Sequence, residues 1–268
     1  MDFKTFRAKF KSLPADRQNF LKIMAIAYEP MRQTNLSKLL NECEVKTAQG
    51  AKFNGANVKG YWQLLSDDWI DEPSYNQFEI KPHLKELVMR MAVIDSNFDK
   101  WVREIQKEMP YKDWYRPISF EAAIRELRIA LYQGRVLGIS DILREIDMYY
   151  PNKFEESNFF EHFFNPFNAK WMATFPIEIQ NTALENLVFQ AVFDLKPVDE
   201  YLNFMLESKY LSHPEKGKEF RSYLNTVYLL QGKLSEAADI LTKEKNPVSM
   251  NVRAAWINFL KGDNKLAV

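Results

Sequence analysis

Lysine and amide side chains between residues 46 and 63 have the chemistry to contact duplex nucleic acid. Lysines neutralise backbone phosphates, and asparagine or glutamine can pair with adenine edges through two hydrogen bonds. The local charge agrees, because residues 1–60 contain 11 Lys or Arg and five acids, although the whole chain has a formal net charge of zero. The candidate nucleic-acid-binding residues are Lys46, Lys52, Asn54, Asn57, Lys59 and Gln63.

Acidic residues directly after this segment argue against DNA binding. Asp67, Asp68, Asp71 and Glu72 would repel the phosphates of a duplex. A few lysines on a helix surface also commonly serve solubility alone. Duplex binding and plain protein packing therefore both stay open as interpretations of this segment.

The stretch "FEESNFFEHFFNPFNAKWMATFP" is unusually aromatic. Aromatic rings can stack on bases or grip a peptide. Glu155, Glu156 and Glu161 accompany the rings and only Lys170 is basic, which argues against a groove for single-stranded nucleic acid. The helical spacing is typical of interior packing, with a partner-binding surface as the alternative. The candidate partner-binding residues are Phe159, Phe163, Phe167 and Trp171.

The residue types that serve metal binding or nucleophilic catalysis are sparse. No glycine-rich phosphate loop, no helix with two histidines one turn apart and no cysteine pair occurs. His83, His162 and His213 are far apart in sequence, and Cys43 lies on an apolar stripe where a thiol packs as a small hydrophobe. We assign no catalytic, cofactor-binding or metal-binding residue, and we predict that residues 1–268 are not an enzyme.

The elements that carry the polar candidates lie in residues 1–94. Apolar residues recur at helical spacing after "SLPADRQ", where Ser12 is a candidate cap, then from about residue 34 and again through "ANVKGYWQLLSDDW". The stretch "WIDEPSYNQFEI" predicts a hairpin of residues 69–71 and 77–80, and Pro82 begins a closing helix.

This order of three helices, a hairpin and a helix resembles the winged helix-turn-helix family. In particular, "LLSDDWI" and "FEIKPHLKEL" resemble the end of that family's recognition helix, its wing and its exit helix. The resemblance covers roughly a third of the chain. It implies that the third helix presents Asn57, Lys59 and Gln63 outward.

Beyond Asp95 the chain predicts only amphipathic helices joined by short breaks, and "YLNTVYLLQGKLSEAADILTK" resembles a tetratricopeptide repeat. That family places a glycine in the turn, here Gly232, and a small residue five positions later, here Ala237. "WINFLKGDNKLA" repeats the spacing with Gly262 and Ala267. "ALYQGRVLGISDIL" echoes it, but Ile139 at the alanine place argues against a tight pair there. The predicted helices are 98–108, 120–133, 139–149, 155–164, 177–193, 198–207, 219–231, 235–243 and 248–260.

The predicted fold class is mainly α, with a winged-helix domain at 1–94 and a tetratricopeptide-like solenoid at 95–268. Because a helix pair buries its apolar face only against neighbours, an array that stops at Val268 is expected to be truncated at its C-terminal end. A single cysteine and the lack of a signal-peptide apolar run predict the cytoplasm. Apolar runs are too short to span a membrane.

The preferred functional hypothesis is a non-catalytic N-terminal adaptor or regulatory region of a larger protein. Its expected partners are other proteins or missing C-terminal domains and, as an open alternative, double-stranded DNA; no cofactor is expected. A second hypothesis is an accessory region that helps a bacterial Swi/Snf-type helicase engage DNA, which implies an ATP-dependent motor beyond residue 268. A third is a winged-helix transcription regulator.

Overall fold

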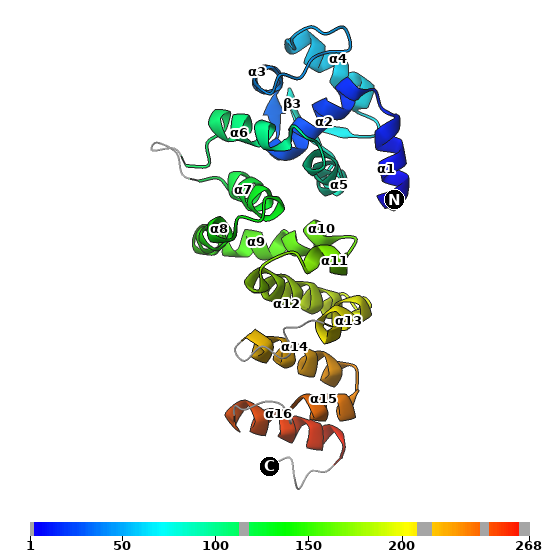
Figure 1. Cartoon of the computed structure of the whole chain (residues 1–268), viewed down its shortest axis with the longest axis vertical. Coiled ribbons are helices and arrows are strands. Elements are labelled where there is room, and N and C mark those ends of the chain that lie inside the picture. The colour runs from blue at the N-terminus through cyan, green and yellow to red at the C-terminus, as the bar shows by residue number, and fades with distance from the viewer. Residues whose placement is uncertain (1–2, 113–117, 208–215, 242–246, 263–268) are drawn as a thin grey trace. The chain divides into compact units, whose positions relative to one another are not determined.

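The structure is a computed structural model that describes residues 3–112, 118–207, 216–241 and 247–262 (Figure 1). It is mainly helical with one small three-stranded sheet, which confirms the predicted α class. The chain forms two compact units, Met1–Phe163 and Phe164–Val268. The domain boundary expected at residues 94 and 95 therefore lies inside the first unit.

The first unit begins with a helix, α1 (Phe3–Ser12), that the sequence did not predict. In α1, Phe6 and Phe10 are fully buried and pack against the Trp69 ring, with centroids 5.7 and 5.8 Å from it. The Ser12 hydroxyl donates to the Lys9 carbonyl at 2.7 Å, so it closes α1 instead of capping the next helix as expected. The elements up to residue 93 are α1 (Phe3–Ser12), α2 (Ala15–Ala27), β1 (Met31–Arg32), α3 (Gln33–Glu42), α4 (Gly55–Leu65), β2 (Ile70–Ser74), β3 (Gln77–Ile80) and α5 (Pro82–Val93).

The sheet has the strand order β1-β3-β2, and both pairings are antiparallel. β2 and β3 form the predicted hairpin, with Ile70 opposite Ile80 and an irregularity between Asp71 and Ser74. β1 adds a third strand by placing Met31 opposite Phe78. A two-residue strand is too short to show an alternating pattern, which is why the sequence did not predict it.

Helices α6 to α9 and α10 up to Phe163 complete the first unit. α7 and α8 pack against each other, and Ile139 on α8 is fully buried, so the doubted helix pair does form. The predicted helix 155–164 is instead two helices, because Asn158 adopts a left-handed conformation with φ 46°. These elements are α6 (Phe98–Glu108), α7 (Phe120–Tyr132), α8 (Val136–Tyr149), α9 (Pro151–Glu156) and α10 (Phe159–Phe164).

The second unit consists of helices in the part of the chain that the structure describes. α14 packs against α12 and α15, and α15 packs against α16. Ala237 on α15 is fully buried, and its carbonyl accepts a 2.8 Å hydrogen bond from the buried Asn225 amide of α14. Ala267 lies outside the described residues. The elements are α11 (Ala169–Met172), α12 (Ile177–Phe193), α13 (Asp199–Glu207), α14 (Lys216–Leu230), α15 (Leu234–Leu241) and α16 (Pro247–Leu260).

Candidate nucleic-acid interface and partner surface

Helix α4 is held by its N-terminal cap and by its buried face. The Asn54 side chain accepts a 2.9 Å hydrogen bond from the Asn57 backbone amide, which satisfies one donor of the first turn. Val58 is fully buried, and the Trp62 ring packs on Phe78 of the sheet at 5.2 Å. The opposite face of α4, which carries Lys59 and Gln63 one turn apart, is exposed.

The loop before α4 is fixed by side-chain contacts. Asn41 on α3 both donates to the Phe53 carbonyl at 2.9 Å and accepts from its amide at 2.8 Å. The Tyr61 hydroxyl accepts from the Ala48 amide at 3.0 Å and donates to Asp16. This loop, which carries Lys46 and Lys52, is therefore tied to α2, α3 and α4.

The three candidate lysines are available to an anionic ligand. Lys46, Lys52 and Lys59 are exposed, and none forms an ion pair with any residue that the structure describes. The amides are less available, because Asn54 is engaged as a helix cap and the Asn57 side chain donates to the Lys52 carbonyl at 3.3 Å. Gln63, in contrast, is exposed on α4.

The acidic residues near the hairpin are partly matched by lysines. Lys9 of α1 pairs with Asp68 at 2.7 Å, and Lys81 lies 3.9 Å from Asp71. Lys81 also donates to the Asp67 carbonyl at 2.8 Å. These pairs are exposed and add little stability, but they reduce the negative field that was expected to repel DNA.

Lys46 belongs to a second surface feature, a solvent-open depression of about 470 Å³. Its wall combines Lys46 and Lys100 with Asp16 and Glu44, and Lys100 and Glu44 form an ion pair. The depression therefore carries both signs of charge. Five of the six candidate nucleic-acid-binding residues lie on α4 or directly before it. The sixth, Lys46, lines this depression instead.

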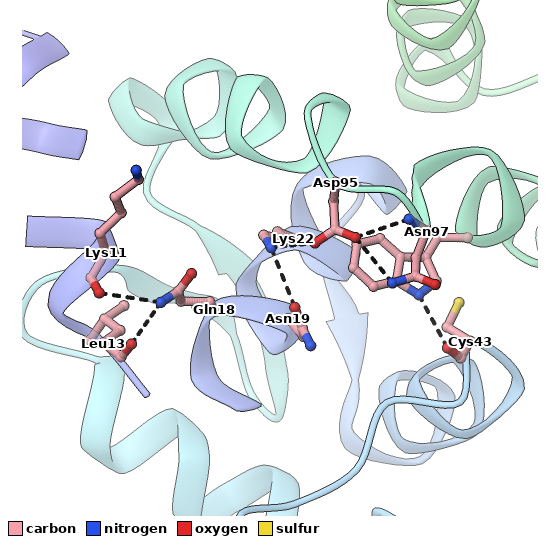
Figure 2. A network of polar contacts seen from close by, with 9 residues as sticks. Lys11, Leu13, Gln18, Asn19, Lys22, Cys43, Asp95 and Asn97 are labelled. Atoms are coloured by element: carbon pink, nitrogen blue, oxygen red, sulfur yellow. Dashed lines mark hydrogen bonds and ion pairs between the residues drawn. The ribbon is translucent and has the colours of Figure 1, made fainter. Parts of the chain in front are cut away.

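Figure 2 shows the polar contacts that hold the turn before α6 to α2 and α6 itself to the end of α3. Lys22 pairs with Asp95 at 2.6 Å, and the Trp101 indole donates to the Cys43 carbonyl at 3.1 Å. Burial acts to raise the pKa of Asp95, but hydrogen bonds from Lys22 and Asn97 outweigh it and hold that pKa below its usual value. Cys43 is 2% exposed, and burial raises the pKa of its thiol to about 12, so it packs as the sequence indicated.

The aromatic candidates pack mainly on other aromatic rings. Phe163 is fully buried and its centroid lies 5.6 Å from that of Phe159, which is 7% exposed. Phe167 packs on Tyr201 at 5.0 Å, and Trp171 packs on Phe175 at 5.2 Å. Phe167 and Trp171 keep partial exposure, whereas the burial of Phe159 and Phe163 favours the packing interpretation for those two rings.

Two buried arginines of α7 were not singled out from the sequence. Arg125 and Arg128 are each 1% exposed. Arg125 pairs with Glu29 at 2.6 Å, and Arg128 pairs with Glu86 of α5 and donates to the Ala25 carbonyl of α2 at 3.1 Å. The available signal was a pair of arginines three positions apart on the helix with the apolar stripe of Ala123, Leu127 and Leu131.

The part of the chain that the structure describes offers little support for a metal site or a histidine-based catalytic site. Within it, no group of three or more His, Cys, Asp or Glu residues could hold a metal ion. His83 and His162 are exposed, and His213 lies outside the described residues. Of the helices that the structure describes, none combines the length and the apolarity needed to cross a bilayer.

Comparison of the chain with protein-family models, with curated proteins and with solved structures found no match.

Proposed function

We propose that this chain is a non-catalytic adaptor region, in which a winged helix precedes tetratricopeptide-like helix pairs that bind other proteins. Support for the winged helix comes from the order α2, β1, α3, α4, β2, β3 and α5 with the strand order β1-β3-β2. In such a fold α4 is the recognition helix, the β2–β3 hairpin is the wing and α5 is the exit helix.

The observation that carries the adaptor proposal is the recurrence of one helix-pair turn. Gly134 and Gly232 have φ of 64° and 70°, and each amide donates to the carbonyl three residues earlier at 3.1 Å. At both turns the next amide donates five residues back at 2.9 Å. Gly262 follows α16 with φ 81°. Repeated pairs of this kind build extended surfaces that suit protein binding.

An exposed aromatic pair on α16 allows a test of this proposal. Trp256 and Phe259 are each 57% exposed, and large aromatic residues often dominate binding energy at interfaces. Replacing both with alanine should leave the fold intact and lower the yield of captured partners at least tenfold, as measured by quantitative affinity capture. The matched control replaces Met148 and Tyr149, which are 65% and 60% exposed on α8. Equal capture by both variants, or substrate turnover by the chain alone, would contradict the adaptor role.

Contact with duplex DNA is a second candidate function, favoured by three exposed lysines that form no ion pair with the residues that the structure describes. Changing Lys46, Lys52 and Lys59 to alanine should weaken duplex affinity at low salt at least tenfold. It should also reduce the salt slope by roughly 0.9 per lost phosphate contact. The control changes Lys170, Lys218 and Lys233, which are exposed lysines of the second unit. Fluorescence anisotropy at several salt concentrations provides the measurement.

Both the helicase-accessory and the regulator hypotheses require this DNA contact. A wild-type chain without salt-dependent affinity for duplex would contradict all DNA proposals while leaving the adaptor proposal intact. Equal losses in the two triple variants would show that α4 and its preceding loop are not the contact surface.

A further inference from the structure

Helix α1 carries a one-sided stripe of positive charge. Lys4, Arg7 and Lys11 are exposed, and their spacing of three and four residues places them on one face of the helix. The sequence of α1 includes no aspartate or glutamate. Solubility is usually served by a mixture of both charges, so an all-positive face indicates an anionic partner.

These three cations form no ion pair with any residue that the structure describes. Figure 2 shows the Lys11 side chain extending away from its own carbonyl, which accepts a hydrogen bond from the Gln18 side-chain amide at 3.4 Å. By contrast, Lys112 of the same unit pairs with Glu145 at 2.5 Å. The charges of the stripe are therefore available to a ligand.

The stripe works against the stability of its own helix. Lys4 lies in the first turn, where the helix dipole disfavours positive charge. Arg7 and Lys11 are one turn apart, and like charges at that spacing repel each other. Because the arrangement weakens the helix in the unbound chain, a ligand that neutralises the charges explains it better than folding does.

Helix α1 is anchored beside the end of α4. Phe6 and Phe10 are fully buried, and both rings pack on Trp69. Lys9 pairs with Asp68 in the turn after α4 at 2.7 Å, and its ammonium lies 5.7 Å from the centroid of the Trp69 ring. The stripe is therefore presented by a helix that is already in place, so only its side chains lose freedom on binding.

Three observations favour the phosphates of a duplex over an anionic membrane as the partner. A helix that binds a membrane surface buries its apolar face in lipid, whereas Phe6 and Phe10 are buried within the protein. The helix rises about 10 Å from Lys4 to Lys11, and a duplex offers about six phosphates over that length. The same unit also carries the exposed candidate lysines of α4 and its preceding loop, which the same ligand would neutralise.

We propose that the basic stripe of α1, formed by Lys4, Arg7 and Lys11, binds the phosphate backbone of duplex DNA. The inference rests on the proposed duplex contact and extends it to a surface other than α4 and the loop before it. Phosphate contacts position a protein on a duplex without reading its bases, so the contribution of α1 is the same for duplexes of different sequence.

The test measures the affinity of the full chain for a fluorescent duplex by anisotropy at several salt concentrations. Replacing Lys4, Arg7 and Lys11 with glutamine, a good helix former, should weaken affinity at low salt at least tenfold and lower the salt slope by about 2.7. The loss should be equal for A·T-rich and G·C-rich duplexes. The Tm of this variant should not fall, because repulsion within α1 is removed, and this separates lost binding from lost folding. Lys4→Arg, Arg7→Lys and Lys11→Arg together keep all three charges and should keep the slope.

The matched control replaces Lys107, Lys112 and Arg144 with glutamine. These are exposed cations of the same unit, and each already pairs with a carboxylate. The change in net charge is identical to that of the α1 variant. A salt slope close to that of the wild type is therefore expected for the control.

The possible outcomes separate this inference from the function on which it rests. A wild-type chain without salt-dependent affinity would overturn both the stripe and the duplex contact. If the wild type binds and the glutamine variant of α1 matches the control, the stripe alone is overturned. A loss in the α1 variant, with none on changing Lys46, Lys52 and Lys59, would support the stripe and remove α4. Co-sedimentation with phosphatidylcholine–phosphatidylserine vesicles tests the alternative, and vesicle binding that needs the stripe while duplex binding does not would overturn the proposal.

Discussion

Replacing Arg128 with methionine is expected to destabilise the first unit by about 3–5 kcal/mol, because it leaves a buried carboxylate without its cation. The Arg128 guanidinium pairs with Glu86, whose side chain is only 14% exposed. It also lies 4.4 Å from the centroid of the Tyr28 ring and donates to Ala25. Methionine restores most of the volume, so the measured loss reports on charge and hydrogen bonding. Urea unfolding of the full chain gives the free energy.

The control for this substitution is Arg144→Met on the neighbouring helix α8. Arg144 is 73% exposed and pairs with Asp141 three residues earlier, so its loss should change stability by less than about 0.5 kcal/mol. Adding Glu86→Gln to Arg128→Met should recover part of the loss by removing the unpaired charge. Equal effects of the two single arginine substitutions would show that the buried pair contributes nothing.

Phe163→Ala is expected to destabilise the first unit by about 3–5 kcal/mol, because it removes a fully buried ring and leaves a cavity. The ring packs on Tyr132 at 4.9 Å, and the Phe163 carbonyl accepts a 2.6 Å hydrogen bond from Arg90 of α5. Thermal unfolding should therefore show a lower Tm for the transition of this unit.

Tyr75→Ala provides the comparison, since an aromatic ring is removed from a side chain that is 89% exposed. Its effect on the free energy of unfolding should stay below about 0.5 kcal/mol. A Phe163→Ala chain that keeps wild-type stability yet captures fewer partners would instead support the partner-surface interpretation of this aromatic stretch.

Hydrophobic periodicity was sufficient to place most helices. The predicted helix 98–108 coincides with α6, and the helix predicted from residue 120 differs from α7 by one residue at its end. The spacing of Gly232 and Ala237 predicted the turn between α14 and α15, where Ala237 is fully buried. These features depend on local sequence, which is why a single chain reveals them.

Features that depend on long-range contacts were not visible in the sequence. The burial of Arg125 and Arg128 requires Glu29 and Glu86, which lie far away in the chain. The pairing of Asp68 with Lys9 likewise joins residues from α1 and the turn after α4, so charge counting along the chain overstated the negative field. Asn54 differs from these residues, because it was assigned to base contact although it makes a local contact, accepting from the Asn57 amide as the cap of its own helix.

The arginine contacts of α7 have a consequence for how this chain can be divided or recombined. A fragment ending at residue 94 would keep Glu29 and Glu86 but lose the guanidinium groups that neutralise them. In such a fragment the carboxylates of Glu29 and Glu86 would have lost their arginine partners. It would therefore be a poor choice of domain for a chimaeric protein. A shortened or recombined gene must therefore keep the helix pair α7 and α8 together with the helices and sheet that precede it, so that these ion pairs form.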